Sequence, residues 1–169
     1  MNRKYTKDDI EEALKELIGQ QLTNIGRAGN LLWLSFGEKI LVIDRNGCEK
    51  FKEKYALHVQ CSWRLTTENK ISVASKDIYI PRTGLDEDDF DWDEFGANRF
   101  DEKIEELKEQ IVSSATVSKI TADEFGGLKI YFESGIRLEV FPDDSLEDEF
   151  WRFIIFGSES KHYVVFDKD

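Results

Sequence analysis

The stretch LKIYFESGIRLEV, residues 128–140, is the clearest guide to the fold. Apolar side chains occupy every second position on both sides of Ser134-Gly135, a dipeptide that is typical of a hairpin turn. The alternating apolar residues are Leu128, Ile130, Phe132, Ile136, Leu138 and Val140. We therefore expect two antiparallel strands here, with one face buried and the other polar.

Two amphipathic helices are predicted, one before each run of strands. Near the N-terminus, Thr6 and Asp9 form a capping pair, and Gly19 is a natural end for the helix. The apolar stripe of this helix is Ile10, Ala13, Leu14, Leu17 and Ile18. The second helix begins near Asp101, where acidic residues suit the first turn. Its stripe is Ile104, Leu107, Ile111 and Val112.

The two helix-plus-strand units can be overlaid with small changes in spacing. Ile104 follows its counterpart Ile10 by 94 residues, and Trp151-Arg152 follows Trp63-Arg64 by 88 residues. The spacing changes most in the loops, as it does in a diverged duplication. Two unrelated units of this kind would also share such patterns, so both explanations stay open.

The sequence therefore predicts an α+β fold. We expect two helix-plus-antiparallel-meander halves, about residues 5–83 and 98–166, arranged as a pseudo-twofold duplication that shares one core. An acidic and aromatic segment, residues 84–97, joins the halves within a single globular unit of residues 1–169. The sequence leaves open whether the strands form one sheet or two.

The net charge of -12 is unevenly distributed along the chain. Residues 1–83 carry 14 Lys and Arg against 11 Asp and Glu, a net of +3, and residues 84–169 carry 9 against 24, a net of -15. Such a field repels nucleic acid and anionic membranes and attracts basic proteins. No apolar stretch is long enough to span a membrane, and the N-terminus lacks the apolar region of a signal peptide. We therefore expect a cytoplasmic protein with no nucleic-acid or membrane partner.

No metal or cofactor is predicted. The spacing Asp89-x-Asp91-x-Asp93 resembles the start of an EF-hand loop, but Glu94 stands where that loop needs Gly, and Phe100 stands where it needs Glu. No phosphate-binding loop or nucleophile elbow is present, so the sequence favours a protein that is not an enzyme. The Cys and His residues, which lack the spacing of zinc ligands, are Cys48, His58, Cys61 and His162.

The segment from Leu57 to Leu65 is predicted as one strand with an apolar and a polar face. Cys61 falls on the apolar face, as a small hydrophobic residue, and cannot form a local nucleophilic pair with a histidine on the other face. The polar face could line a pocket; its alternative is a solvated face, or arginines paired with buried carboxylates. The candidate pocket residues are His58, Gln60, Arg64 and, from the equivalent place in the second half, Arg152.

A resemblance rests on the same segment. The run His58-Val59-Gln60-Cys61-Ser62-Trp63-Arg64, with Trp151-Arg152-Phe153 near the end, resembles an uncharacterised family of small bacterial proteins. The resemblance extends over most of the chain and implies a bacterial, cytosolic protein. It carries no established activity and transfers no catalytic residue.

Two acidic segments interrupt the framework that the halves share, and insertions of this kind often carry function. In the first, seven of the nine residues from Asp86 to Glu94 are acidic, and aromatic rings alternate with carboxylates. The second follows Pro142. The candidate partner-binding residues are Asp86, Asp88, Asp89, Asp91, Trp92, Asp93, Asp143, Asp144 and Glu147. The alternative is a linker whose aromatic rings anchor it to the core.

The main functional hypothesis is a non-catalytic cytosolic binding protein, such as an immunity protein that inhibits a basic toxin. Carboxylates and rings on its surface would then cover a positively charged active site, for example that of a nuclease. The second hypothesis is a small-molecule-binding protein or an enzyme that uses the polar strand face of His58 and Arg64. A pocket that contains both residues would favour this second hypothesis.

Overall fold

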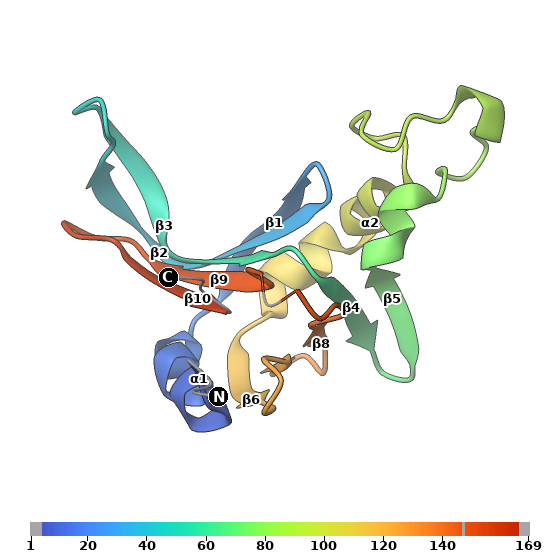
Figure 1. Ribbon diagram of the computed structural model, residues 1–169. Coiled ribbons are helices and arrows are strands. Elements are labelled where there is room, and N and C mark those ends of the chain that lie inside the picture. Colours follow the sequence, from blue (N-terminus) through green and yellow to red (C-terminus); the bar gives the residue numbers. More distant parts are fainter. Residues whose placement is uncertain (1–4, 147, 166–169) are drawn as a thin grey trace.

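The structure is a computed structural model that describes residues 5–146 and 148–165. Its two antiparallel sheets and two α-helices confirm the predicted α+β fold (Figure 1). The helices are α1 (Lys7–Leu14) and α2 (Arg99–Ser114), with short 3-10 helices η1 (Lys15–Leu17), η2 (Ser75–Tyr79) and η3 (Glu87–Asp89). The strands are β1 (Leu22–Ala28), β2 (Leu31–Ile43), β3 (Glu49–Val59), β4 (Ser62–Thr67), β5 (Lys70–Ala74), β6 (Val117–Ala122), β7 (Leu128–Phe132), β8 (Arg137–Phe141), β9 (Trp151–Ile155) and β10 (Lys161–Val165).

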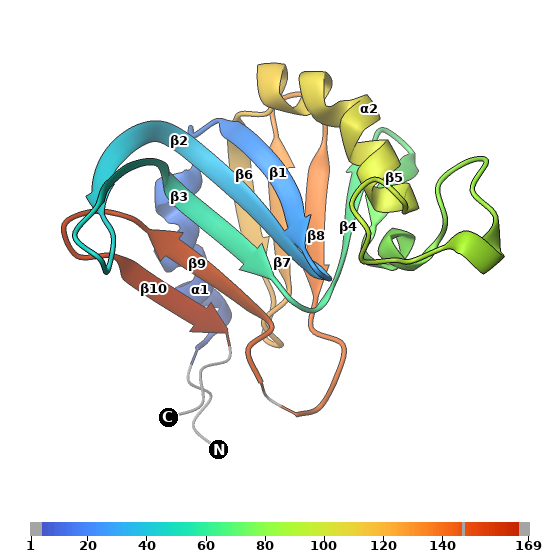
Figure 2. The same cartoon turned by 90° about the horizontal axis from the view of Figure 1, so that it is seen from above.

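Each sheet combines three strands from one half of the chain with a hairpin from the other half. Sheet 1 has the order β1-β2-β3-β9-β10, and sheet 2 has the order β6-β7-β8-β4-β5. The two halves thus exchange their last two strands, and sheet 1 lies in front of sheet 2 in Figure 2. The strands therefore form two sheets, and neither sheet belongs to one half alone.

The register of the two sheets follows the overlay of the two halves. Leu22 pairs with Phe36 and Val117 pairs with Phe132, and each strand pair has an irregularity directly after this position. In the exchanged hairpins, Trp151 pairs with Val59 and Trp63 with Val140, at equivalent positions of β3 and β8. A duplication predicts this common strand order, and the duplication itself stays a prediction.

One hydrophobic core lies between the sheets and includes residues of both helices. The helix α1 packs against β6, and α2 packs against β1, so each helix contacts the first strand of the other half. Ile10 and Leu14 of α1 and Phe100 and Ile104 of α2 are buried in the same cluster as the inner faces of both sheets. Among the described residues, the helices are too short or too polar to cross a lipid bilayer.

Local capping explains where the helices begin. Thr6 and Asp9 form the predicted capping box at the start of α1. The second helix begins slightly before the expected Asp101, because the side chain of Asn98 accepts a hydrogen bond from the amide of Asp101 (2.9 Å) and caps it. The first α-helix ends at Leu14 and continues as the turn η1, which leaves Ile18 half exposed instead of in the predicted stripe.

Candidate functional site

The acidic segment of residues 84–97 forms an arm that projects from the body of the protein beyond α2 and β5 (Figure 1). We call it the acidic arm. Its two ends are held together at the base: the amide of Arg82 donates to the carbonyl of Ala97 (2.9 Å), and the amide of Arg99 donates to the carbonyl of Ile80 (2.8 Å). The arm is therefore a long loop whose two ends lie side by side in the fold.

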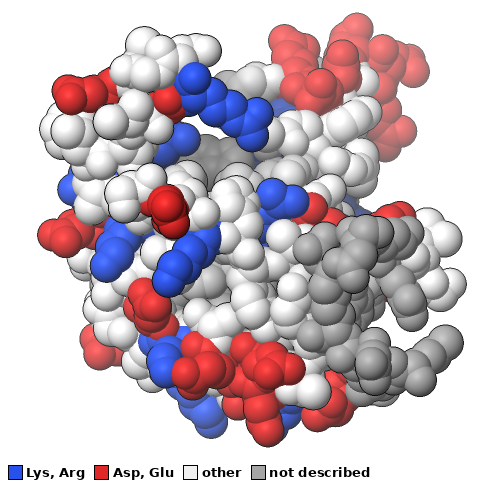
Figure 3. All heavy atoms as spheres, turned by 60° about the vertical axis from the view of Figure 1, so that its left-hand side comes forward, with Lys and Arg blue, Asp and Glu red and all other residues white. Residues whose placement is uncertain are grey.

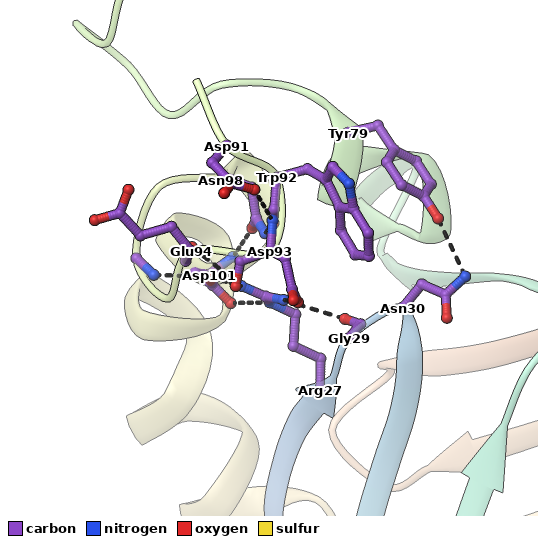
Figure 4. Close-up of polar contacts among 11 residues, drawn as sticks. Arg27, Gly29, Asn30, Tyr79, Asp91, Trp92, Asp93, Glu94, Asn98 and Asp101 are labelled. Carbon is purple, nitrogen blue, oxygen red and sulfur yellow. Dashed lines mark hydrogen bonds and ion pairs between the residues drawn. The ribbon is translucent and has the colours of Figure 1, made fainter. Parts of the chain in front are cut away.

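Buried Arg27 of β1 anchors the base of the acidic arm (Figure 4). Its side chain is only 4% exposed, and its guanidinium donates two hydrogen bonds of 2.9 Å to the carboxylate of Asp101. The same guanidinium donates to the backbone carbonyls of Asp93 (3.3 Å) and Glu94 (3.2 Å). Asp101 also accepts from the amide of Gly96 (2.8 Å), so a bidentate ion pair inside the fold fixes the backbone of the arm.

Trp92 gives the arm a second attachment. Its carbonyl accepts a hydrogen bond from the fully buried side chain of Asn98 (2.9 Å), and its ring packs on Tyr79 with 5.3 Å between ring centroids. The Tyr79 hydroxyl in turn accepts from the side chain of Asn30 (3.2 Å) in the β1–β2 turn. The expected role of the arm's aromatic residues as anchors thus applies to Trp92, although its ring stays partly exposed.

The outer part of the arm presents carboxylates and one bare aromatic ring. The phenyl ring of Phe95 is 89% exposed. Carboxylates gather over the arm at the upper right of Figure 3, and a second acidic group lies at the bottom, over α1. The exposed acidic residues of the arm are Asp86, Glu87, Asp88, Asp89, Asp91, Asp93 and Glu94.

Among the predicted partner-binding residues of the arm, some have internal contacts. Asp93 lies 3.5 Å from the Arg27 guanidinium, and the side chain of Asp91 accepts from the amide of Asp93 (3.0 Å). Asp86 caps η3 through the amide of Asp88 (3.2 Å). The side chain of Asp89 makes no such contact within the described part of the chain.

The second acidic segment lies between β8 and β9, and we call its described residues, 142–146 and 148–149, the acidic loop. Asp143 accepts a hydrogen bond from the hydroxyl of Ser62 (2.5 Å), and Asp144 accepts from the amide of Leu146 (2.8 Å). Glu147 lies outside the described residues. The loop and the arm lie apart in both Figure 1 and Figure 2, so the structure does not bring the two acidic segments together.

The predicted single strand from Leu57 to Leu65 is wrong. The strand β3 ends at Val59 in sheet 1, and β4 begins at Ser62 in sheet 2, because the chain crosses between the sheets at Gln60 and Cys61. The sequence does not reveal this crossing. Cys61 is buried as well, so the alternation of buried and exposed residues continues from one strand into the next.

This crossing separates the candidate pocket residues. His58 lies on the outer face of sheet 1 and Arg64 on the outer face of sheet 2, because their neighbours in each strand point into the core. Gln60 is exposed in the connection. The structure brings His58 together with Arg152 instead, as partners in neighbouring strands.

Arg152 is held by a carboxylate and a histidine. Its guanidinium donates to both oxygens of Glu149 (2.9 and 2.8 Å) and contacts Nδ1 of His162 (3.2 Å). Burial and the positive charge of Arg152 lower the pKa of His58. The outer face of sheet 1 therefore carries His58 from the first half beside Arg152 and His162 from the second.

Arg64 belongs to a different network, centred on a buried carboxylate. Its Nε donates to Glu139, whose side chain is only 3% exposed. Nε of Arg137 and Nζ of Lys129 lie 3.4 and 3.6 Å from the other carboxylate oxygen. Burial raises the pKa of Glu139, but the hydrogen bond from Arg64 and the three positive charges outweigh it, and the pKa lies below its ordinary value.

Two hollows lie elsewhere on the surface, and His162 is among the residues that line one of them. One of about 320 Å³ lies between the two stems of the acidic arm and is lined by Arg82 and Phe95 among others. The other, of about 490 Å³, lies between α1 and the β9–β10 hairpin, with Phe153 and Tyr163 among its lining residues. Neither hollow is lined by His58 or Arg64, so neither supplies the pocket that the second hypothesis requires.

The described part of the chain gives little support to a reactive cysteine or a metal site. Burial, with the negative charge of Asp143, raises the pKa of the Cys61 thiol to about 12, so it stays protonated at neutral pH. Cys48 is exposed and also a free thiol. No group of three or more potential metal ligands occurs among the described residues.

The chain was compared with protein-family models, curated proteins and solved structures, and none of them matches it.

The roles of four residues of the site were not predicted from the sequence. Arg27 and Asp101 are far apart in the sequence, and a lone charged residue in a predicted strand carries no signal of its burial. Glu139 likewise alternates with apolar residues as a surface residue would. Asn98 could have been identified, because Asn three residues before Asp101 is a typical helix cap.

Proposed function

We propose that this chain is a non-catalytic cytoplasmic binding protein, of the immunity type, whose acidic arm binds and occludes a basic protein such as a toxin. The observation that carries the proposal is the combination of a fixed base and a bare outer surface in one segment. Arg27 and Asn98 hold the arm's backbone, while Phe95 and the carboxylates of Asp88 and Asp89 point to solvent.

A fixed arm supports binding because less conformational entropy is lost when it meets a partner. An ordered aromatic residue such as Phe95 can supply buried apolar area at the centre of an interface, where a few residues provide most of the binding energy. Covering an exposed Phe contributes about 1.5–3 kcal/mol. The surrounding carboxylates would attract a basic partner and raise the association rate.

The first experiment identifies the partner by differential capture from a lysate of the native cell. Three immobilised proteins are compared: the wild type, an arm variant with Asp88→Lys, Asp89→Lys and Phe95→Ala, and a control with Glu105→Lys, Glu109→Lys and Phe51→Ala. Glu105 and Glu109 are exposed on α2, and Phe51 is 72% exposed on β3, so the control matches the change in charge and apolar surface.

The proposal expects a basic protein that the wild type and the control retain and that the arm variant loses. Capture that is the same for all three proteins, or an arm-dependent partner that is acidic, would contradict it.

Kinetic measurements on the captured partner then separate the roles of charge and ring. Asp88→Lys with Asp89→Lys is expected to lower the association rate roughly tenfold at low salt, with a smaller effect at high salt. Phe95→Ala is expected to act on the dissociation rate instead, by roughly tenfold or more if the ring is central to the interface. Unchanged rates in both variants would show that the arm is only a connection.

A further inference from the structure

The outer face of sheet 2 carries an excess of positive charge in a chain whose net charge is -12. Arg64 of β4, Lys129 of β7 and Arg137 of β8 surround the single carboxylate of Glu139. We call these four residues the basic face. Three cations and one carboxylate leave a local charge of +2.

The donors of the basic face outnumber the acceptors that Glu139 offers. One carboxylate oxygen accepts from Nε of Arg64, and the other lies 3.4 Å from Nε of Arg137 without a hydrogen bond in suitable geometry. Nε of Arg137 is buried and has no hydrogen-bond acceptor among the described residues. Each of the three cationic side chains is nonetheless 38–47% exposed, so their remaining N–H groups can reach a ligand from solvent.

Aromatic rings hold the guanidinium groups in place. The Arg64 guanidinium lies over the ring of Phe141, 5.1 Å from its centroid, and the Arg137 guanidinium lies 5.8 Å from the centroid of Tyr131. Lys119 approaches the same Tyr131 ring at 5.7 Å and adds a further cation at the edge of the face. Stacked, paired guanidinium groups lose little freedom when they bind a multidentate anion.

We propose that the basic face binds a phosphate dianion, either inorganic phosphate or the phosphate group of a small phosphomonoester. A phosphate monoester carries a charge of about -1.5 to -2 at neutral pH, which matches the local charge of +2, and its three terminal oxygens can use donors from several side chains. A carboxylate ligand would offer fewer oxygens than a phosphate dianion and about half of its negative charge. The proposal concerns a face distinct from the acidic arm and does not depend on the proposed function.

The test is an NMR titration of the full chain with inorganic phosphate and, separately, with phenyl phosphate, at constant ionic strength balanced with chloride. The proposal expects saturable shifts confined to β4, β7 and β8 and to the side-chain Nε–H groups of Arg64 and Arg137. The probe that binds more tightly identifies the source of the phosphate group, since only the phenyl ester can also use the rings of Tyr131 and Phe141.

Variants distinguish a binding site from a structural ion network. Arg64→Gln and Arg137→Gln should each weaken binding roughly tenfold or more, because each removes a charged hydrogen-bond donor. Glu139→Gln should strengthen binding, because it removes the competing carboxylate, whereas a purely structural network would gain nothing. Arg45→Gln, in the exposed β2–β3 turn, is the control and should leave the affinity unchanged.

The proposal is overturned if neither probe gives saturable shifts on this face, or if the arginine variants bind as the wild type does while keeping its thermal stability. It is equally overturned if a single-stranded oligonucleotide binds here and neither small phosphate does.

Discussion

The two Trp-Arg pairs occupy equivalent places in the two sheets but have different surroundings. Trp151 is fully buried and its indole N–H donates to the carbonyl of Gly126 (2.8 Å), whereas the indole N–H of buried Trp63 has no acceptor among the described residues. Arg64 lies opposite the carboxylate of Glu139, and Arg152 lies opposite the imidazole of His58. The shared framework thus fixes where these side chains lie, while the outer-face partner determines what charge each sheet presents.

A second comparison concerns the first strand of each half. Arg27 of β1 pairs with Leu32, and Ala122 of β6 pairs with the equivalent Leu128. A buried guanidinium in one half therefore stands where the other half has a methyl group. This guanidinium is the anchor of the acidic arm.

The largest expected effect comes from breaking that anchor. Arg27→Met would leave the carboxylate of Asp101 buried without its partner, and we expect a loss of about 3–5 kcal/mol in the free energy of unfolding. Urea denaturation followed by fluorescence measures this loss. The double variant Arg27→Met with Asp101→Asn removes the unpaired charge and should recover part of the stability; a loss below about 1 kcal/mol for the single variant would contradict the anchoring role.

The two tryptophans give the next largest difference. Trp151→Phe removes the donor to the Gly126 carbonyl, whereas Trp63→Phe removes an N–H that has no acceptor among the described residues. Both changes delete a similar ring volume. Trp151→Phe should therefore lower the free energy of unfolding by about 1–3 kcal/mol more than Trp63→Phe. Paired denaturation curves measure this difference, and equal losses would show that the hydrogen bond contributes nothing net.

The smallest expected effects are on the pH dependence of stability, to which His58 and Glu139 contribute in different pH ranges. The folded-state pKa of His58 is lowered, so its contribution to stability is present above the ordinary value of 6.5 and is lost as the pH falls from 6.5 through its lower folded-state value. The pKa of Glu139 is also lowered, so its contribution is present above 4.5 and is lost as the pH falls through its lower folded-state value.

Melting temperatures between pH 8 and pH 3 can separate the two windows. His58→Gln should flatten the profile near and below pH 6.5, and Glu139→Gln should flatten it only below pH 4.5. If His58→Gln flattened the profile only below pH 4.5 and Glu139→Gln flattened it near pH 6.5, the lowered pKa values of the two groups would be contradicted. The same holds if neither variant changed the profile.

The sequence predicted most of the framework because the buried faces follow simple periodicity. The alternation of residues 128–140 became β7 and β8 with their hairpin, and Thr6 caps α1 as expected. Periodicity could not reveal the crossing at Gln60 and Cys61, because the strands on both sides keep the same alternation. It also carries no information about partners in the third dimension, so the pairs Arg27–Asp101 and Arg64–Glu139 could only be seen in the folded chain.

The exchange of hairpins has a consequence for how the chain is made. During synthesis β1, β2 and β3 emerge before the other strands, but β9, the second neighbour of β3 in sheet 1, follows only after β4 to β8. Until then β3 is an unpaired edge with apolar residues on one face, and such edges attract strands from other chains. The nascent protein therefore depends on β9 to cover the open edge of β3, and conditions that slow synthesis between β3 and β9 should favour aggregation through β3.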